Sequence, residues 1–414
     1  MAGIYIHIPF CKSRCLYCGF YSTTRTSSRQ QYVDALCREI QLRSNYLDEP
    51  VNTVYIGGGT PSQLEPAQLE QLFEALAGSR LLPRPEGKCN PRFTQVGEIC
   101  NPLFPNEITI ECNPDDVTPS FAESLSRLPV NRVSMGAQTF SDDRLRFLRR
   151  RHTSGQIARA VDLLRKAGIA NISIDLMFGF PGETIDEWHR DIDAAIALQV
   201  EHLSAYALMY EEGTPLYHLL EQGLVEEADE ELSRQMYYDL ADRLSAAGFE
   251  HYEISNFARP GRRSQHNSSY WNATPYLGLG AAAHSFDRNS RQWNVSDLDA
   301  YIKGVHSSQA MLHSSQPAVH RLQAWLPFVA GRELLDATTR YNDTVMTALR
   351  TSEGLALHLL TDRQRTYCLA NAGKYLDNGL LVNEGGRLRL SRSGLFVSDM
   401  IMADLMMVPS LHHN

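Results

Sequence analysis

Three cysteines within eight residues are the strongest chemical signal in this chain of 414 residues. Cys11, Cys15 and Cys18 have the spacing C-x3-C-x2-C, which lets a single loop point three sulfur atoms at one centre. A structural zinc site normally takes four protein ligands, and a catalytic zinc held only by thiolates would be a poor Lewis acid. An iron–sulfur cube binds cysteine thiolates and can keep one iron open. The spacing therefore favours an iron–sulfur cluster over zinc.

The remaining cysteines give no comparable signal; they are Cys37, Cys112, Cys368, Cys89 and Cys100. We interpret the first three as small buried apolar residues, which is the usual role of scattered thiols. The last two lie in residues 78–106, a proline-rich stretch without periodicity that predicts an inserted surface loop. No histidine or further cysteine accompanies that pair, so we interpret both as loop thiols.

The composition limits the classes of function. A formal net charge of −9 argues against a general nucleic-acid binder, which should be basic. No run of about 18 apolar residues predicts a membrane-spanning helix. The N-terminus lacks the basic and apolar regions of a signal peptide, so we expect a cytoplasmic protein that is not an integral membrane protein. The length suits two domains with a large buried core.

Six short apolar runs alternate with amphipathic stretches in the first half of the chain. The stretch 154–168 is typical of these helices, with Gly168 as its C-terminal stop. Repeated strand-then-helix units predict a parallel sheet with right-handed crossovers, either an open sheet or a partial barrel. The predicted strands are 4–10, 53–58, 107–112, 132–138, 171–179 and 202–208.

Polar or glycine-rich residues follow five of these runs, where each strand should end. The cysteines follow the first run, "GGGTPS" (57–62) the second and "ECNP" (111–114) the third. Gln138 ends the fourth run, and Asp175 with the following "GFPGET" ends the fifth. The carboxyl ends of parallel strands share one edge, so we expect a binding site there.

The cysteine spacing, with an aromatic residue directly before the third cysteine, resembles the radical S-adenosylmethionine (SAM) superfamily. "YIGGGTPS", "ITIECNPDD", "RVSMGAQTF", "IDLMFGFPGET" and "HNSSYW" extend the resemblance to its coproporphyrinogen dehydrogenase branch, over nearly the whole chain. The resemblance implies a [4Fe-4S] cluster whose open iron is chelated by SAM. Electron transfer from such a cluster cleaves SAM to methionine and a 5′-deoxyadenosyl radical.

The resemblance also implies which residues contact SAM. Carboxylates suit ribose hydroxyls and ammonium groups, and arginine suits a carboxylate. Simpler roles stay open, because Glu111 could cap a turn, Asp175 could form a salt bridge, and Arg150 lies in a run of three arginines. The implied SAM contacts are Tyr5, Tyr17, Gly58, Gly59, Thr60, Glu111, Gln138, Arg150, Asp175 and Met209.

Two features separate the members of this branch. The anaerobic oxidase has a fourth cysteine where this chain has Phe20, together with a long N-terminal extension, whereas only ten residues precede Cys11 here. Both departures favour the heme-chaperone group of the branch. That group carries an H-N-x-x-Y-W motif, which matches "HNSSYW" at residues 266–271.

The resemblance implicates His266 in heme binding. Imidazole can ligate heme iron, and Tyr270 and Trp271 offer flat apolar faces. Arg262 and Arg263 could neutralise propionates. A hydrogen-bonded, partly buried histidine is the alternative for His266. We interpret His7 and His284 as structural or adjacent to the cofactor.

The expected fold is α/β, a radical SAM partial (β/α)6 barrel with a C-terminal winged-helix-like α+β domain. We expect the barrel in residues 1–230, a connecting region in 231–305 and the C-terminal domain in 306–414. The favoured function is a heme chaperone that transfers heme to an acceptor hemoprotein, at the membrane by family analogy. The main alternative is oxygen-independent conversion of coproporphyrinogen III to protoporphyrinogen IX. A DNA-binding regulator is disfavoured, because residues 331–414 are not basic overall.

Overall fold

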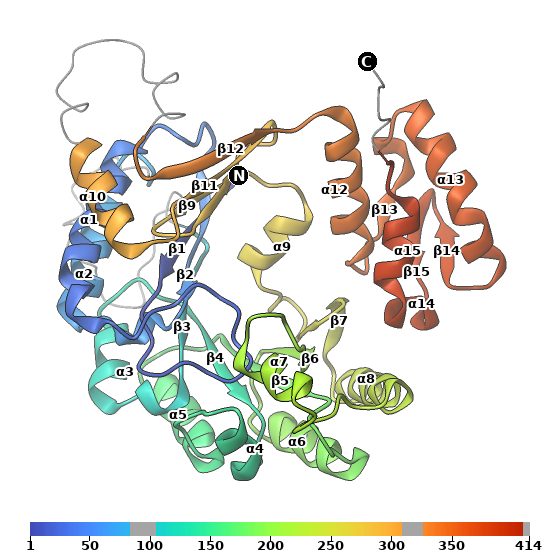
Figure 1. Ribbon diagram of the computed structural model, residues 1–414, viewed down its shortest axis with the longest axis horizontal. Helices are drawn as coiled ribbons and strands as arrows, with labels where there is room; N and C mark the ends of the chain where they lie inside the picture. Colours follow the sequence, from blue (N-terminus) through green and yellow to red (C-terminus); the bar gives the residue numbers. More distant parts are fainter. Residues whose placement is uncertain (83–104, 309–325, 409–414) are drawn as a thin grey trace.

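The computed structural model describes residues 1–82, 105–308 and 326–408. Within these residues one large mixed sheet has the strand order β12-β11-β10-β9-β1-β2-β3-β4-β5-β6-β8-β7 (Figure 1). The six strands β1 to β6 are neighbours and run parallel, which confirms the predicted partial (β/α)6 barrel. They are β1 (Ala2–Ile8), β2 (Val51–Gly58), β3 (Glu107–Cys112), β4 (Arg132–Gln138), β5 (Ile172–Phe178) and β6 (His202–Ala207).

Helices connect these strands and cover the outside of the sheet (Figure 1). They are α1 (Arg29–Leu42), α2 (Pro66–Gly78), α3 (Pro119–Ser126), α4 (Asp142–Phe147), α5 (Ser154–Lys166) and α6 (Ile185–Ala197). Side chains cap the first turns of α3, α4 and α6. Thr184, for example, accepts a hydrogen bond from the amide of Glu187, whose side chain binds back to the amide of Thr184. Gly168 has φ +90° just after α5, as expected for a helix stop.

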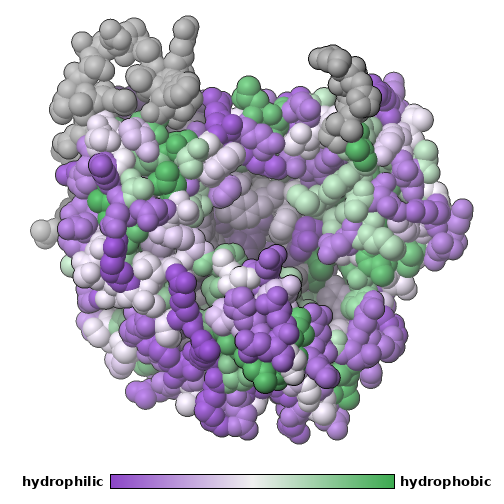
Figure 2. Space-filling view, viewed as in Figure 1, coloured by the Kyte–Doolittle hydropathy of each residue, from purple (hydrophilic) through white to green (hydrophobic). Residues whose placement is uncertain are grey.

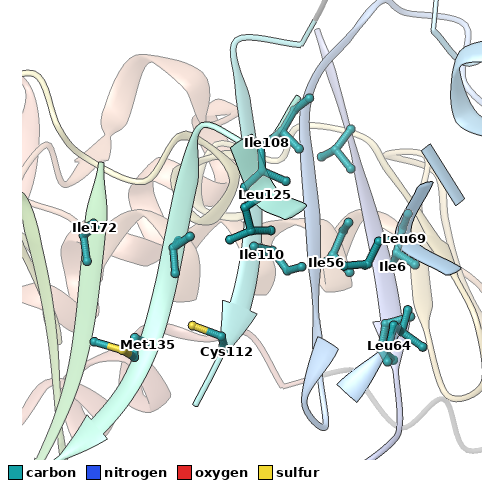
Figure 3. Close-up of a cluster of buried hydrophobic side chains, with 14 of the residues drawn as sticks. Ile6, Ile56, Leu64, Leu69, Ile108, Ile110, Cys112, Leu125, Met135 and Ile172 are labelled. Atoms are coloured by element: carbon teal, nitrogen blue, oxygen red, sulfur yellow. The ribbon is translucent and has the colours of Figure 1, made fainter. Parts of the chain in front are cut away.

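Alternation along the strands divides them into an outer and an inner face. Outer side chains such as Ile6, Ile56 and Ile110 pack under the helices and are fully buried (Figure 3). Inner side chains at the intervening positions are mostly polar or glycine, including Tyr55, Glu111, Arg132, Asp175 and His202. The apolar core of the barrel therefore lies between strands and helices. Its inner face is left for hydrogen bonding.

Further strands extend the sheet at both edges. Beyond β6 lie β8 (Asn256–Ala258) and β7 (Glu250–Glu253), and beyond β1 lie β9 (Tyr276–Leu279), β10 (His284–Phe286), β11 (Ser290–Asn294) and β12 (Val329–Leu334). α7 (Pro215–Glu221) and α8 (Glu230–Ala246) follow β6, α9 (Gln265–Trp271) precedes β9, and α10 (Leu298–Ser307) packs on α1. The face in view is hollowed near its centre, where α9 lies in Figure 1 (Figure 2).

The C-terminal domain has its own hydrophobic core, which includes Tyr341, Leu355 and Leu388. Its helices surround a three-stranded sheet of order β13-β15-β14, which confirms the predicted winged-helix-like α+β arrangement. The elements are α12 (Ala337–Leu349), β13 (Leu355–Ala356), α13 (Asp362–Asp377), β14 (Leu381–Glu384), β15 (Arg387–Leu390), α14 (Arg392–Phe396) and α15 (Ser398–Leu405).

The C-terminal domain contacts the edge of the barrel sheet at β7. Arg350 donates a hydrogen bond to the buried carboxylate of Glu253 at 3.0 Å, and the amide of Ile254 donates to the carbonyl of Arg350 at 3.1 Å. Residues 83–104, with Cys89 and Cys100, form most of the predicted inserted loop and lie outside the described residues.

Candidate functional site

The cysteine loop follows β1, at the carboxyl end of the barrel. Cys11, Cys15 and Cys18 are half-buried free thiols. The loop is fixed by backbone hydrogen bonds, from the amide of Cys11 to the carbonyl of Thr23 at 2.9 Å and from Leu16 to Leu148 at 3.1 Å. The strand and the loop together bring the three thiols near one another on the barrel rim.

The chemistry of this loop fits a cluster ligated by three cysteines. Burial raises the pKa of the Cys11 and Cys18 thiols, and nearby Cys15 adds to the rise. Thiols that repel one another's negative charge are suited to a cationic iron centre, which binds them as thiolates. In the described parts of the chain, no three His, Cys, Asp or Glu side chains converge on one point as metal ligands would. The three cysteines therefore lie on the same loop, but their side chains would have to rearrange to bind a cluster.

The glycine turn after β2 lies against the same loop. Gly58 has φ +111°, and a Cβ atom there would lie 2.5 Å from Cε1 of His7. A Cβ at Gly59 would lie 2.8 Å from the carbonyl carbon of Pro9. Only glycine permits this approach of two backbones. The hydroxyl of Thr60 lies 3.5 Å from the Cys11 sulfur, which joins this turn to the cysteine loop.

Two carboxylates of the inner face lie near this turn. Glu111 Oε2 accepts a hydrogen bond from the Gly58 amide at 3.0 Å. Burial raises the pKa of Glu111 to about 7, and Asp175 adds to that rise. Burial also raises the pKa of Asp175 to about 6, although Ser204 and Arg132 oppose the rise. Both groups are thus poised between the neutral and charged forms, a property of acids that meet a polar ligand.

Gln138 and Arg150 lie close together beside Gly136, and Arg150 contacts the cysteine loop. Gln138 ends β4 at φ +67°, in a backbone conformation that is rare for residues with a side chain and recurs at functional sites. Arg150 donates to the Asn113 side chain at 2.6 Å and to the Gly136 carbonyl at 2.7 Å, and it lies 3.4 Å from the Cys15 sulfur. Of the run of three arginines, Arg150 is the one that contacts a cluster cysteine.

The remaining predicted SAM residues occupy different positions. Tyr5 is on the inner face of β1 and shares a hydrogen bond of 3.0 Å with His7. Tyr17 packs beside Leu16, and burial raises its pKa. Met209 follows β6 and exposes 61% of its side chain. The structure therefore places these three around the site without a direct bond to the cysteines.

Asp116 joins the loops that form the rim, and the sequence analysis missed it. Its buried carboxylate accepts from Lys12 in the cysteine loop at 2.7 Å, and from Ser62 at 2.9 Å and Gln63 at 2.7 Å in the glycine turn. Arg151 adds a contact of 3.3 Å. The signal was present in "ECNPDD", but two adjacent aspartates on a turn do not reveal which loops they will bind.

His266 lies at the opposite end of the barrel from the cysteines. Its amide and that of Gln265 donate to the two oxygens of Glu107, each at 2.9 Å. Its Nδ1 shares a hydrogen bond with Thr53 at 2.8 Å. Thr53 lies five residues before Gly58 along β2, roughly 16 Å at the rise of a strand. The cysteine rim and the HNSSYW segment are therefore at different ends of the same strands.

The imidazole of His266 is fully buried, and both of its nitrogens are in use. Nε2 shares a hydrogen bond of 2.9 Å with the Tyr270 hydroxyl. Burial lowers the pKa of His266 to about 3, and the Arg132 cation adds to that effect. In this conformation the histidine is neutral and hydrogen-bonded, with no nitrogen left for iron. The family resemblance favoured a heme-binding role for His266 over this alternative.

Trp271 and Arg263, two other predicted heme contacts, bind other residues of the protein in the structure. The Trp271 ring lies under the guanidinium of Arg350, 5.2 Å from its centroid, so it contacts the C-terminal domain. Arg263 pairs with Glu250 at 3.2 Å and Glu353 at 2.6 Å. Arg262 is exposed, and His284 is exposed and stacks on Trp293.

Two protein-family models match the chain. They describe the radical SAM superfamily, over residues 5–195, and the HemN C-terminal domain, over residues 335–397. The fold is similar to the solved coproporphyrinogen III oxidase HemN of Escherichia coli, with a TM-score of 0.74 over 98% of this chain and 90% of that one. Sequence identity between the two is 19%, so this likeness concerns the fold. In the parts of the chain that the structure covers, no helix is both long and apolar enough to span a bilayer.

Relatives of higher sequence identity match most of the chain. The heme chaperone HemW of Mycobacterium tuberculosis is 33% identical over 98% of this chain and 94% of its own length. HemW of Bacillus subtilis is 35% identical over 73% of this chain and 75% of its own length. The identity to these two relatives, together with the barrel and the cysteine rim, shows that the chain belongs to the heme chaperone HemW family within the radical SAM superfamily.

Proposed function

We propose that this protein is a heme chaperone that binds heme and passes it to an acceptor hemoprotein, while carrying a [4Fe-4S] cluster and SAM. Two relatives that are 33–35% identical to this chain are named heme chaperones, which supports the heme role. The acceptor that we propose is a hemoprotein at the membrane. The cluster would be held by Cys11, Cys15 and Cys18.

One observation at the end of the cysteine loop favours a chaperone over an oxidase. Phe20 exposes 77% of its side chain where the oxidase has a fourth cysteine, so no thiol stands there to take part in chemistry. When bound at a reduced cluster, SAM supplies a 5′-deoxyadenosyl radical. Around it, Glu111 and Asp175 offer acceptors, Arg150 a cation, and the glycine turn backbone amides, with Tyr5, Tyr17, Gln138 and Met209 as the proposed surrounding contacts.

Heme binding at HNSSYW would require a local change in α9. His266 can ligate iron through Nε2 only after Tyr270 releases that nitrogen. Tyr270 and Trp271 would then be free to pack against the porphyrin. We therefore propose that heme enters where α9 meets the C-terminal domain, at the contact between Trp271 and Arg350.

The test uses anaerobically purified protein with its cluster reconstituted. Heme is titrated into wild type, His266→Ala and the control His202→Ala, and the visible spectrum is followed. His202 is also fully buried with both nitrogens bonded, to Ser173 at 2.7 Å and Tyr252 at 2.8 Å, but on β6. We expect stoichiometric heme binding that only His266→Ala weakens, by about tenfold or more.

The same preparation is then incubated with coproporphyrinogen III, SAM and a reductant. The chaperone proposal expects no protoporphyrinogen IX. Turnover of coproporphyrinogen without specific heme binding would identify the oxidase instead.

A further inference from the structure

The HNSSYW segment is connected to the predicted SAM pocket by a single tyrosine of β2. The Tyr55 ring stacks on the His266 imidazole, with ring centroids 5.2 Å apart and an angle of 26° between the planes. Tyr55 also stacks on Tyr5, its register neighbour on β1, with ring centroids 6.2 Å apart. Tyr55 is 9% exposed, so its ring is packed against both partners. A change in the position of His266 therefore removes one of the two aromatic contacts of this ring.

Tyr55 passes this constraint to Glu111. Its hydroxyl donates to Glu111 Oε1 at 2.6 Å, a short hydrogen bond of the strength expected for a charged acceptor. The other oxygen, Oε2, accepts from the amide of Gly58 at 3.0 Å. The carboxylate is thus held at two points, by the inner face of β2 on one side and by the glycine turn on the other.

The space around this contact leaves little freedom. A Cβ atom at Gly57 would lie 2.7 Å from the Tyr55 ring and 2.9 Å from the Glu111 carboxylate. Gly58, the next residue, is held at φ +111°. The turn that is predicted to meet the methionine end of SAM is therefore packed directly on the pair of Tyr55 and Glu111.

His266 itself is strongly fixed. Thr53 and Tyr270 bind its ring, and Glu107 binds its amide. A Cβ at Gly3 would lie 3.3 Å from the ring, so the backbone of β1 also packs against it. These contacts fix the position of the imidazole, so the ring on which Tyr55 stacks is held in place.

We propose that His266 and Tyr55 are positioning residues for the SAM pocket: His266 supports the Tyr55 ring, and the Tyr55 hydroxyl orients Glu111 toward the glycine turn. The HNSSYW segment then influences SAM affinity from the other end of the barrel. The inference rests on the proposed function only in taking SAM as the ligand of the rim. It does not require that heme binds.

The test measures SAM binding by equilibrium dialysis with the cluster-loaded protein, without heme. Tyr55→Phe keeps the ring and removes the hydroxyl, so we expect SAM to bind about tenfold more weakly. His266→Ala removes the support, and we expect a weakening of about threefold to tenfold. Because His266 acts through Tyr55, the double variant should bind SAM no more weakly than Tyr55→Phe alone.

His202→Ala is the matched control, because it removes an equally buried histidine that does not contact Tyr55. It should lower thermal stability and leave SAM affinity within about twofold of wild type. His266→Gln keeps one donor and one acceptor and should restore much of the affinity lost in His266→Ala. If His266→Ala does not fold, the cycle is run with His266→Gln and a proportionally smaller expected effect.

Two results would overturn the inference. One is an additive double variant, in which both substitutions weaken SAM binding independently. The other is an equal loss of SAM affinity in His202→Ala, which would mean that general destabilisation is the cause. If the wild-type protein did not bind heme, the proposed function would be contradicted. This inference would still stand, since SAM binding is measured without heme.

Discussion

The two ends of the barrel use residues of similar chemistry in opposite ways. At the carboxyl end, three half-buried thiols are free, and Phe20 and Met209 beside them are largely exposed. At the amino end, His266 is fully buried with its ring nitrogens and its amide all bonded. Cysteine and histidine are both metal ligands, yet only the cysteines are available to a metal in this conformation.

The difference shows that residue type and motif do not by themselves identify a ligand. What matters is whether the fold leaves the atom unbonded. The cysteine thiols at the carboxyl end are half-buried and form no disulfide, whereas the buried His266 at the amino end binds Thr53 and Tyr270 through its ring and helps to hold α9. Heme ligation at the amino end therefore requires opening, but cluster binding at the carboxyl end requires only a rearrangement of the cysteine loop.

The largest expected effect tests the carboxyl end. Cys15→Ala should reduce the iron content of reconstituted protein to background and abolish SAM binding, because one ligand of three is lost. The free energy of unfolding should change by less than about 1 kcal/mol, since the thiol is only half-buried. Iron analysis and chemical denaturation measure both quantities, with Cys37→Ala as a control that keeps its iron. A Cys15→Ala protein that retained the cluster would contradict the ligand assignment.

Asp116→Ala should separate the loops of the rim. Its carboxylate is buried and binds two cations and two polar side chains, so we expect a loss of about 3 kcal/mol in the free energy of unfolding. Urea denaturation measures the loss. Asp115→Ala is the matched control, because among the described residues Asp115 forms one ion pair, with Arg151, and should cost less. Equal losses in the two variants would show that Asp116 does not join the loops.

Stability should depend on pH in opposite directions at the two ends. The pKa of Glu111 is raised from 4.5 to about 7, so the folded protein holds that proton more tightly and stability falls as pH rises through this window. The pKa of His266 is lowered from 6.5 to about 3, so stability falls as pH falls through that window. At about 1.4 kcal/mol for each pH unit between the two pKa values, the contributions should be about 3 kcal/mol for Glu111 and about 5 kcal/mol for His266, measured by denaturation at a series of pH values.

Glu111→Gln should remove part of the first dependence, because Asp175 and Glu183, whose pKa values burial raises to about 6 and about 7, titrate in the same window. His266→Gln should remove part of the second. His7, whose pKa burial lowers to about 4, would remain as another contributor on the acid side. A Glu111→Gln protein with the same slope as wild type between pH 4.5 and 7 would refute the assignment of that window.

Heme and SAM should weaken each other's binding if iron takes His266 away from Tyr55. We expect SAM affinity to fall by several-fold when heme is saturating, and by thermodynamic linkage heme affinity should fall by the same factor when SAM is saturating. Tyr55→Phe should remove most of the coupling. Calorimetric titration of each ligand in the presence of the other measures it. Unchanged affinities in wild type would mean that heme binds without moving His266.

The smallest expected effect concerns Phe20. Its phenyl ring is 77% exposed, so Phe20→Ser should change the free energy of unfolding by less than about 0.5 kcal/mol and leave the iron content unchanged. Phe257→Ser, at a fully buried ring on β8, is the contrasting variant and should destabilise strongly. A large loss of stability from Phe20→Ser would show that the ring packs against a partner in solution.

The sequence predicted the parts of the fold that depend on local patterns. The six strands begin and end within about two residues of the predicted runs, because apolar periodicity and turn residues are local signals. The residues at the strand ends were predicted to lie on one rim, and the loops after β1, β2 and β3 contact one another there. Asp175, in contrast, lies inside β5, three residues before the strand ends. Contacts such as those of Glu111 with the glycine turn follow from that geometry.

The placement of α9 could not be predicted in this way. It depends on Glu107 and Thr53, which lie about 160 and 210 positions earlier in the chain than His266. No local pattern around "HNSSYW" shows that these side chains will capture it. Asp116 was missed for the same reason, because its role arises from four donors on three different loops.

The alternation of polar and apolar side chains along β1 to β6 has a consequence for how such a protein can evolve. Because the apolar packing is on the outer face, a substitution on the inner face changes hydrogen bonds and leaves the apolar contacts between strands and helices in place. The inner face can therefore acquire a new task while the shell of strands and helices stays intact. One ancestral barrel could in this way have given rise both to proteins that transform a molecule and to proteins that only carry one.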